Sequence, residues 1–182
     1  FTVTEPRLPD IEKFYTTEET PSISPENTRD EIIKSVTGLT GKSEMALLTM
    51  YVYRQMDMID WIPFIKASME RNPVCYSELE SMLVDEVYGI LGKMPDESIY
   101  DGNRLALPDE VWNFRRGDGV EKALMLADFI GMKYPGSPVQ IEISESRVVL
   151  RYRTEEYPFH SSKGFRKLIW ISGNAYSVKD LS

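Results

Sequence analysis

The chain has one cysteine and one histidine, Cys75 and His160, and these two side chains could together perform nucleophilic chemistry. A thiol becomes a nucleophile when an imidazole removes its proton, and cysteine hydrolases and acyltransferases use such a pair. This interpretation requires the fold to bring the two within hydrogen-bond reach. The alternative is that Cys75 is a small buried apolar residue, as most lone cysteines are.

A single cysteine and a single histidine exclude several other kinds of site. Neither an internal disulfide nor a cysteine-rich zinc site can form within the chain, and no metal site that needs two imidazoles is possible. The acidic side chains of residues 96–103 lack the spacing and the final glutamate of an EF-hand, which predicts a solvated loop. We therefore expect no metal and no cofactor.

Residues 38–43, Gly-Leu-Thr-Gly-Lys-Ser, end like a phosphate-binding loop. The full pattern needs a glycine at position 36, which is Val36, and a strand before it, where the sequence predicts a helix. The favoured interpretation is a helix stop followed by a cap at Ser43.

The most specific pattern lies just before a long apolar stretch. Residues 115–119 are Arg-Arg-Gly-Asp-Gly, and residues 121–127 are Glu-Lys-Ala-Leu-Met-Leu-Ala. This segment resembles the Arg-x-Gly-Asp-Cys-x-x-(Lys/His/Tyr)-Ala-x-Leu-Leu segment of transglutaminase-like domains, a branch of the papain-like cysteine hydrolase superfamily. Residues 29–61, with Tyr-Val-Tyr at 51–53, are similar to the opening of such domains.

The resemblance implies a fold but not the family's catalysis. In that family the cysteine begins a buried central helix, whose N-terminus stabilises a thiolate. The matching position here is Gly119, which has no side chain. The family also places a histidine early in a later strand, whereas residues 147–153 contain none and His160 lies in a predicted loop.

The same turn supplies the candidate ligand-binding residues, which are Trp112, Arg115, Arg116 and Asp118. An aromatic side chain and guanidinium forks beside a loop could bind a carboxylate or an acidic partner segment. The alternatives are that the tryptophan packs in the core and that the arginines, with those at 147, 151 and 153, pair internally with glutamates 142, 155 and 156.

The chain has 182 residues, of which 42% are hydrophobic and 27% charged, and this length and composition predict one domain preceded by a short arm. Residues 1–23, rich in Pro, Thr and Glu, are predicted to be an extended arm or linker, and residues 24–182 the domain. A net charge of -8 argues against nucleic acid as a partner. No apolar stretch approaches the roughly 18 residues of a membrane span.

The hydrophobic periodicity changes along the chain from helical to alternating. Helices are predicted from Ser24 to Gly38, from Ser43 onward, and over residues 78–91 and 120–132, with a short segment at 108–112. Strands are predicted at 139–143, 148–153 and 168–171. This order predicts an α+β domain of papain-like type, with N-terminal helices and a central buried helix packed on a C-terminal antiparallel sheet.

Three functions remain open on the sequence. The preferred one is a catalytically inactive transglutaminase-like module, a pseudoenzyme, that binds a protein or peptide or serves as a structural domain. The second is a thiol-dependent hydrolase or acyltransferase that uses Cys75 and His160. The third is an unrelated cell-surface binding domain tethered by its N-terminal arm. We expect a soluble protein, with an extracytoplasmic location slightly favoured.

Overall fold

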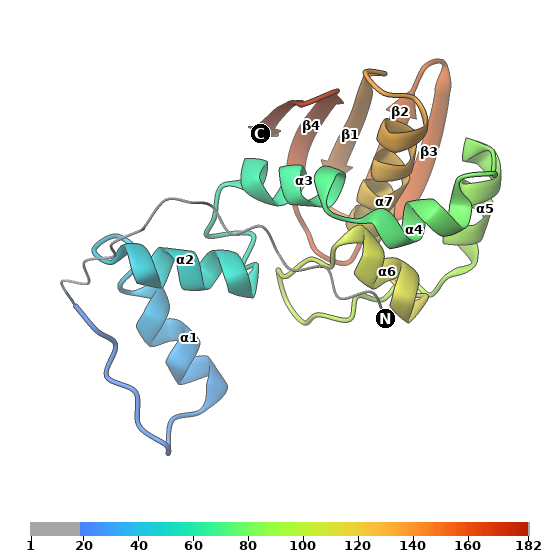
Figure 1. Cartoon of the computed structure of the whole chain (residues 1–182). Helices are drawn as coiled ribbons and strands as arrows, with labels where there is room; N and C mark the ends of the chain where they lie inside the picture. Colours follow the sequence, from blue (N-terminus) through green and yellow to red (C-terminus); the bar gives the residue numbers. More distant parts are fainter. Residues whose placement is uncertain (1–18, 182) are drawn as a thin grey trace. The chain divides into compact units, whose positions relative to one another are not determined.

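The computed structural model describes residues 19–181, which form seven helices followed by five strands (Figure 1). The chain divides into two compact units, one that runs to Val52 and one that begins at Tyr53. The predicted arm, residues 1–23, lies almost entirely outside the described residues. The sequence-based prediction of an α+β architecture, with helices before an antiparallel sheet, is confirmed.

The first unit contains two helices, α1 (Arg29–Thr37) and most of α2 (Glu44–Tyr53). The predicted start of α1 at Ser24 is wrong, because the capping box belongs to Thr28. Its hydroxyl accepts from the N–H of Glu31 at 3.4 Å, and the Glu31 carboxylate accepts from the N–H of Thr28 at 2.8 Å. The predicted stop at Gly38 and the predicted Ser43 cap of α2 are confirmed.

The second unit contains the remaining helices and all five strands. Its helices are α3 (Trp61–Glu70), α4 (Pro73–Leu79), α5 (Val84–Lys93), α6 (Pro108–Phe114) and α7 (Gly119–Lys133). Its strands are β1 (Val139–Ser144), β2 (Arg147–Tyr152), β3 (Glu155–His160), β4 (Arg166–Ser172) and β5 (Ala175–Asp180). They form one antiparallel sheet in the order β3-β2-β1-β4-β5.

Helix α7 is the centre of this unit. Every residue from Gly119 to Ile130 is buried, which confirms the prediction of a buried helix over this stretch. It packs on β1, β2 and β3, while α3, α4, α5 and α6 contact its other sides (Figure 1). The core therefore lies between α7 and the alternating apolar residues of the sheet, such as Ile141, Leu150 and Ile169.

Two local predictions in this unit are wrong. Ser77 does not cap a helix over residues 78–91, because Pro73 begins α4 and the Ser77 hydroxyl donates to the carbonyl of Val74 at 2.9 Å inside it. Residues 157–159 are not a loop but part of β3. A proline is tolerated there because β3 is an edge strand, where a missing N–H costs little.

None of the helices formed by residues 19–181 combines the length and the apolar character that crossing a membrane requires.

Candidate functional site

The N-terminus of α7 is where the resemblance would place a nucleophile. Gly119 is the first residue of the helix and is buried. A Cβ atom at this position would lie 2.6 Å from the carbonyl carbon of His160 and 3.1 Å from its amide nitrogen, and closer still to its carbonyl oxygen. The space that a cysteine side chain would need is therefore filled by the backbone at the end of β3.

Asp118 holds this closed arrangement in place. Its buried carboxylate caps α7 through the N–H of Val120 at 3.0 Å. It also accepts from the Ser161 hydroxyl at 2.6 Å and from the N–H and hydroxyl of Ser162 at 2.7 and 3.1 Å. The carboxylate that was a candidate for ligand binding thus ties the segment after β3 to the helix N-terminus.

Two further residues in the first turn of α7 fix the loop before α6. The buried Glu121 carboxylate accepts from the Ser98 hydroxyl at 2.6 Å and from the N–H of Ala106 at 2.7 Å. Burial raises its pKa, against the effect of these hydrogen bonds. The buried Lys122 ammonium donates to the carbonyl of Met94 at 2.7 Å and to Asp96 at 2.6 Å. Both ionisable groups therefore have structural partners.

The other candidate ligand-binding residues also have internal partners. Trp112 is buried, and its indole N–H donates to Glu78 at 2.9 Å. The Arg115 guanidinium stacks 3.4 Å above the Trp112 ring and pairs with Glu78. Arg116 pairs with Glu97. Trp112, Arg115 and Arg116 therefore pair with carboxylates of the second unit, and none of them lines the pockets beside Asp128, Phe165 and Tyr134.

Cys75 and His160 lie at different ends of α7. Cys75 is buried, and its Sγ is 3.5 Å from Oδ2 of Asp128, in the second half of the helix. The backbone of His160 contacts Gly119, nine residues earlier, which is about 14 Å along a helix axis. Within residues 19–181 no hydrogen bond joins Cys75 to His160. Burial, Asp128 and Asp109 raise the pKa of the thiol, so it stays protonated at neutral pH.

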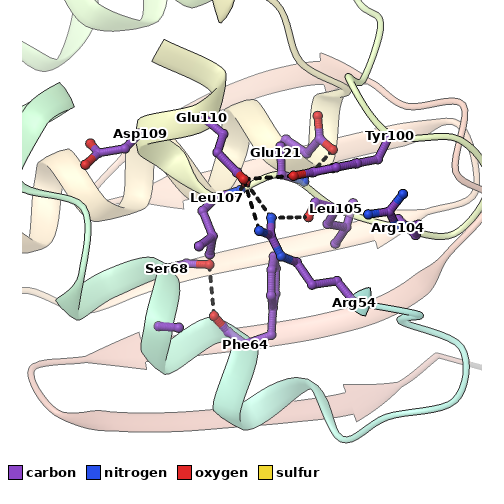
Figure 2. Close-up of polar contacts among 12 residues, drawn as sticks. Arg54, Phe64, Ser68, Tyr100, Arg104, Leu105, Leu107, Asp109, Glu110 and Glu121 are labelled. Atoms are coloured by element: carbon purple, nitrogen blue, oxygen red, sulfur yellow. Dashed lines mark hydrogen bonds and ion pairs between the residues drawn. The ribbon is translucent and has the colours of Figure 1, made fainter. Parts of the chain in front are cut away.

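A cluster that sequence reasoning missed lies where α2 ends (Figure 2). The Arg54 guanidinium forms a two-pronged ion pair with Glu110 and donates to the carbonyl of Leu105 at 3.2 Å. The Tyr100 hydroxyl donates to Glu110 at 2.8 Å, and Arg104 lies 4.2 Å from the centre of the Tyr100 ring. Burial alone would raise the pKa of Glu110, but these hydrogen bonds and the Arg54 charge lower it.

The Glu110 cluster is expected to stabilise the second unit. Glu110→Gln should lower the free energy of unfolding by about 2 kcal/mol, because the mostly buried Arg54 loses its charged partner. Glu156→Gln, which removes one carboxylate from the more exposed pairing of Arg151, is the control and should cost under about 1 kcal/mol. Urea unfolding of both variants checks this, and equal effects would contradict the structural role of the cluster.

The carboxylates predicted for a solvated loop are spread over several partners. Asp96 pairs with Lys122 and Glu97 with Arg116. No cluster of three or more His, Cys, Asp or Glu side chains that could hold a metal ion occurs in residues 19–181.

A further buried carboxyl group, that of Asp128, was not singled out from the sequence. It is the one acidic residue in the apolar run Ala-Leu-Met-Leu-Ala-Asp-Phe-Ile at 123–130, and this isolation was the signal available. It is 2% exposed.

Comparison of the chain with protein-family models, curated proteins and solved structures found no match.

Proposed function

We propose that this chain is a catalytically inactive transglutaminase-like module that binds a protein or peptide segment. The observation that carries the proposal is the start of α7. Gly119 takes the position of the family's nucleophile, and the backbone of His160 fills the volume of the missing side chain. A thiol at this helix N-terminus would require the end of β3 to move.

Two further features support a papain-like arrangement. The buried central helix follows the Arg-Arg-Gly-Asp-Gly segment and packs on a sheet that comes later in the chain. His160 ends β3 and approaches the first residue of that helix with its backbone. The exposed His160 side chain has no thiol partner there, so the proposed module lacks the family's acid/base chemistry.

The sheet offers a place for an extended partner segment. Among residues 19–181, β5 pairs only with β4, which leaves its other edge open. Unpaired backbone groups on such an edge pair readily with an added strand. The opposite edge strand, β3, is less accessible because it contains Pro158 and the Tyr88 hydroxyl donates to the Pro158 carbonyl at 3.0 Å.

The test has a catalytic arm and a binding arm. With a glutamine-containing peptide and an amine as substrates, neither hydrolysis nor amine transfer should exceed the buffer rate, and wild type and Cys75→Ser should behave alike. Turnover that Cys75→Ser abolishes would contradict the proposal. In the binding arm, pools of extended peptides should shift the backbone NMR signals of β5 and leave β3 unchanged, whereas no shift at either edge would count against this binding surface.

A further inference from the structure

A pocket of about 280 Å³ lies beside the second half of α7. This volume is just below the range of about 300–1,000 Å³ that is typical of drug-sized ligands, so it suits a small group. Its polar side chains are Glu70, Asp128, Ser137, Asn174 and Tyr176. No lysine or arginine of the described chain lines it, whereas two acidic residues, Glu70 and Asp128, do.

Asp128 is poorly provided with partners inside this pocket. Its Oδ2 lies 3.5 Å from the Cys75 thiol, and no other polar contact is made to its carboxyl group by residues 19–181. The residue is 2% exposed, and a buried carboxyl group normally accepts or donates several hydrogen bonds, because leaving it without them costs free energy. The pocket thus presents a buried oxygen that is available to a ligand.

The groups that face Asp128 from neighbouring elements are neutral or negative. They are Cys75 on α4, Asp109 on α6, Glu70 on α3 and Tyr176 on β5. Asp109 accepts from the N–H of Cys75 at 2.8 Å, and Glu70 accepts from the Tyr176 hydroxyl at 3.0 Å. No cation of the described chain neutralises Asp128, so a bound cation is the complementary partner.

The rest of the lining is apolar or is backbone. It consists of Met69, Met132, Pro135, Val139 and Ile171 with the glycines at 131, 136 and 173. Such a lining suits a hydrocarbon stem that carries the charge. A calcium ion, in contrast, takes roughly six to eight oxygen ligands, and the pocket has two carboxyl groups.

We propose that this pocket binds an aliphatic primary ammonium group, with Asp128 as the buried acceptor, Glu70 as the second carboxylate and the apolar residues around the stem. A lysine side chain of a bound peptide and a free alkylamine both carry this group. The proposal rests on the pocket alone and holds whether or not the chain is a transglutaminase-like module.

Protonation links this binding to pH. Burial raises the pKa of Asp128 to about 8 in the free protein, with a further contribution from the Asp109 charge and against the lowering effect of the Cys75 contact. The ammonium group favours the ionised carboxylate, so binding near neutral pH releases a proton from Asp128 to solvent. Because only the protein with ionised Asp128 binds the ammonium group, the affinity for this group should rise about fifty-fold from pH 6 to pH 8 and then level off.

The experiment is an NMR titration of the full chain with four probes. Butylammonium is compared with 1-butanol, and Nα-acetyl-lysine methylamide with Nα-acetyl-norleucine methylamide. The two ammonium probes should shift the signals of α7 around Asp128 and of β5 at Tyr176, and the neutral probes should not. Binding of butylammonium alone identifies a free amine as the ligand, and binding of both identifies a lysine side chain as well.

Three variants complete the test. Asp128→Asn should weaken ammonium binding at least ten-fold at pH 8 and abolish its pH dependence. Gly131→Leu places a side chain where a Cβ meets no atom within 4 Å, and should block the pocket while leaving Asp128 in place. Glu155→Gln, on the far edge strand, removes one charge and should bind like wild type. Equal binding of neutral and ammonium probes, or no binding by any, would overturn the proposal.

Discussion

Gly119→Ala is expected to lower the free energy of unfolding by about 3 kcal/mol or more, although alanine is the better helix former. The added methyl group would overlap the backbone of His160, and backbone atoms cannot rotate away as a side-chain tip can. Gly119→Cys should be destabilised in the same way and should gain no hydrolase or transferase activity.

A matched glycine is available as the control. Gly89 lies in α5 and is exposed, and a Cβ atom added there would meet no atom within 4 Å. Gly89→Ala should therefore be neutral or stabilising by up to about 1 kcal/mol. Urea unfolding compares the two variants. A Gly119→Ala protein as stable as Gly89→Ala would show that the end of β3 does not close the helix N-terminus.

Asp128→Asn is expected to change the pH dependence of stability more than any other single substitution in α7. The pKa of Asp128 is raised from 3.8 to about 8 on folding. Between these pH values Asp128 is protonated in the native protein and ionised in the unfolded chain. The contribution of Asp128 to the free energy of unfolding is therefore fully present below pH 4. It is lost as the pH rises to about 8, by at most about 1.4 kcal/mol per pH unit.

An asparagine at this position does not titrate, so the variant should gain stability relative to wild type as the pH rises from 4 to 8. The difference should then stay constant, because Asp128 is ionised in both the folded and the unfolded wild type. Urea unfolding at a series of pH values measures this difference in the free energy of unfolding, with Glu155→Gln as the control for loss of one charge. Parallel curves for Asp128→Asn and wild type would mean that the buried carboxyl group is ionised throughout this range.

The fold could be predicted where hydrophobic periodicity was strong. The run from Val120 gave the buried helix, and the alternation of Val139, Ile141 and Ile143 gave β1. The prediction failed where tertiary position decided the outcome. β3 contains Pro158, which is acceptable only because the strand is at an edge, and β5 alternates weakly because Tyr176 and Val178 are only half-buried there.

The candidate site could be predicted only in part. The Arg-Arg-Gly-Asp-Gly pattern correctly marked a helix start, but Asp118, predicted as a ligand-binding residue, is the cap of that helix. The partners of Asp118 could not be inferred, because Ser161 and Ser162 follow a strand that was not predicted. The contact of Cys75 with Asp128 joins residues 53 positions apart on helices whose packing depends on the whole unit.

The most direct test of the central claim, that this chain has no working thiol nucleophile, is the labelling of its only cysteine in the native protein. Iodoacetamide is added at pH 7.5 and at pH 9, and modification is followed by intact-mass spectrometry, with the urea-unfolded chain as the reference. We expect no rapid label on native Cys75 at either pH and one label per chain after unfolding. Rapid labelling of the native protein at pH 7.5 would show a low-pKa thiolate and contradict the account.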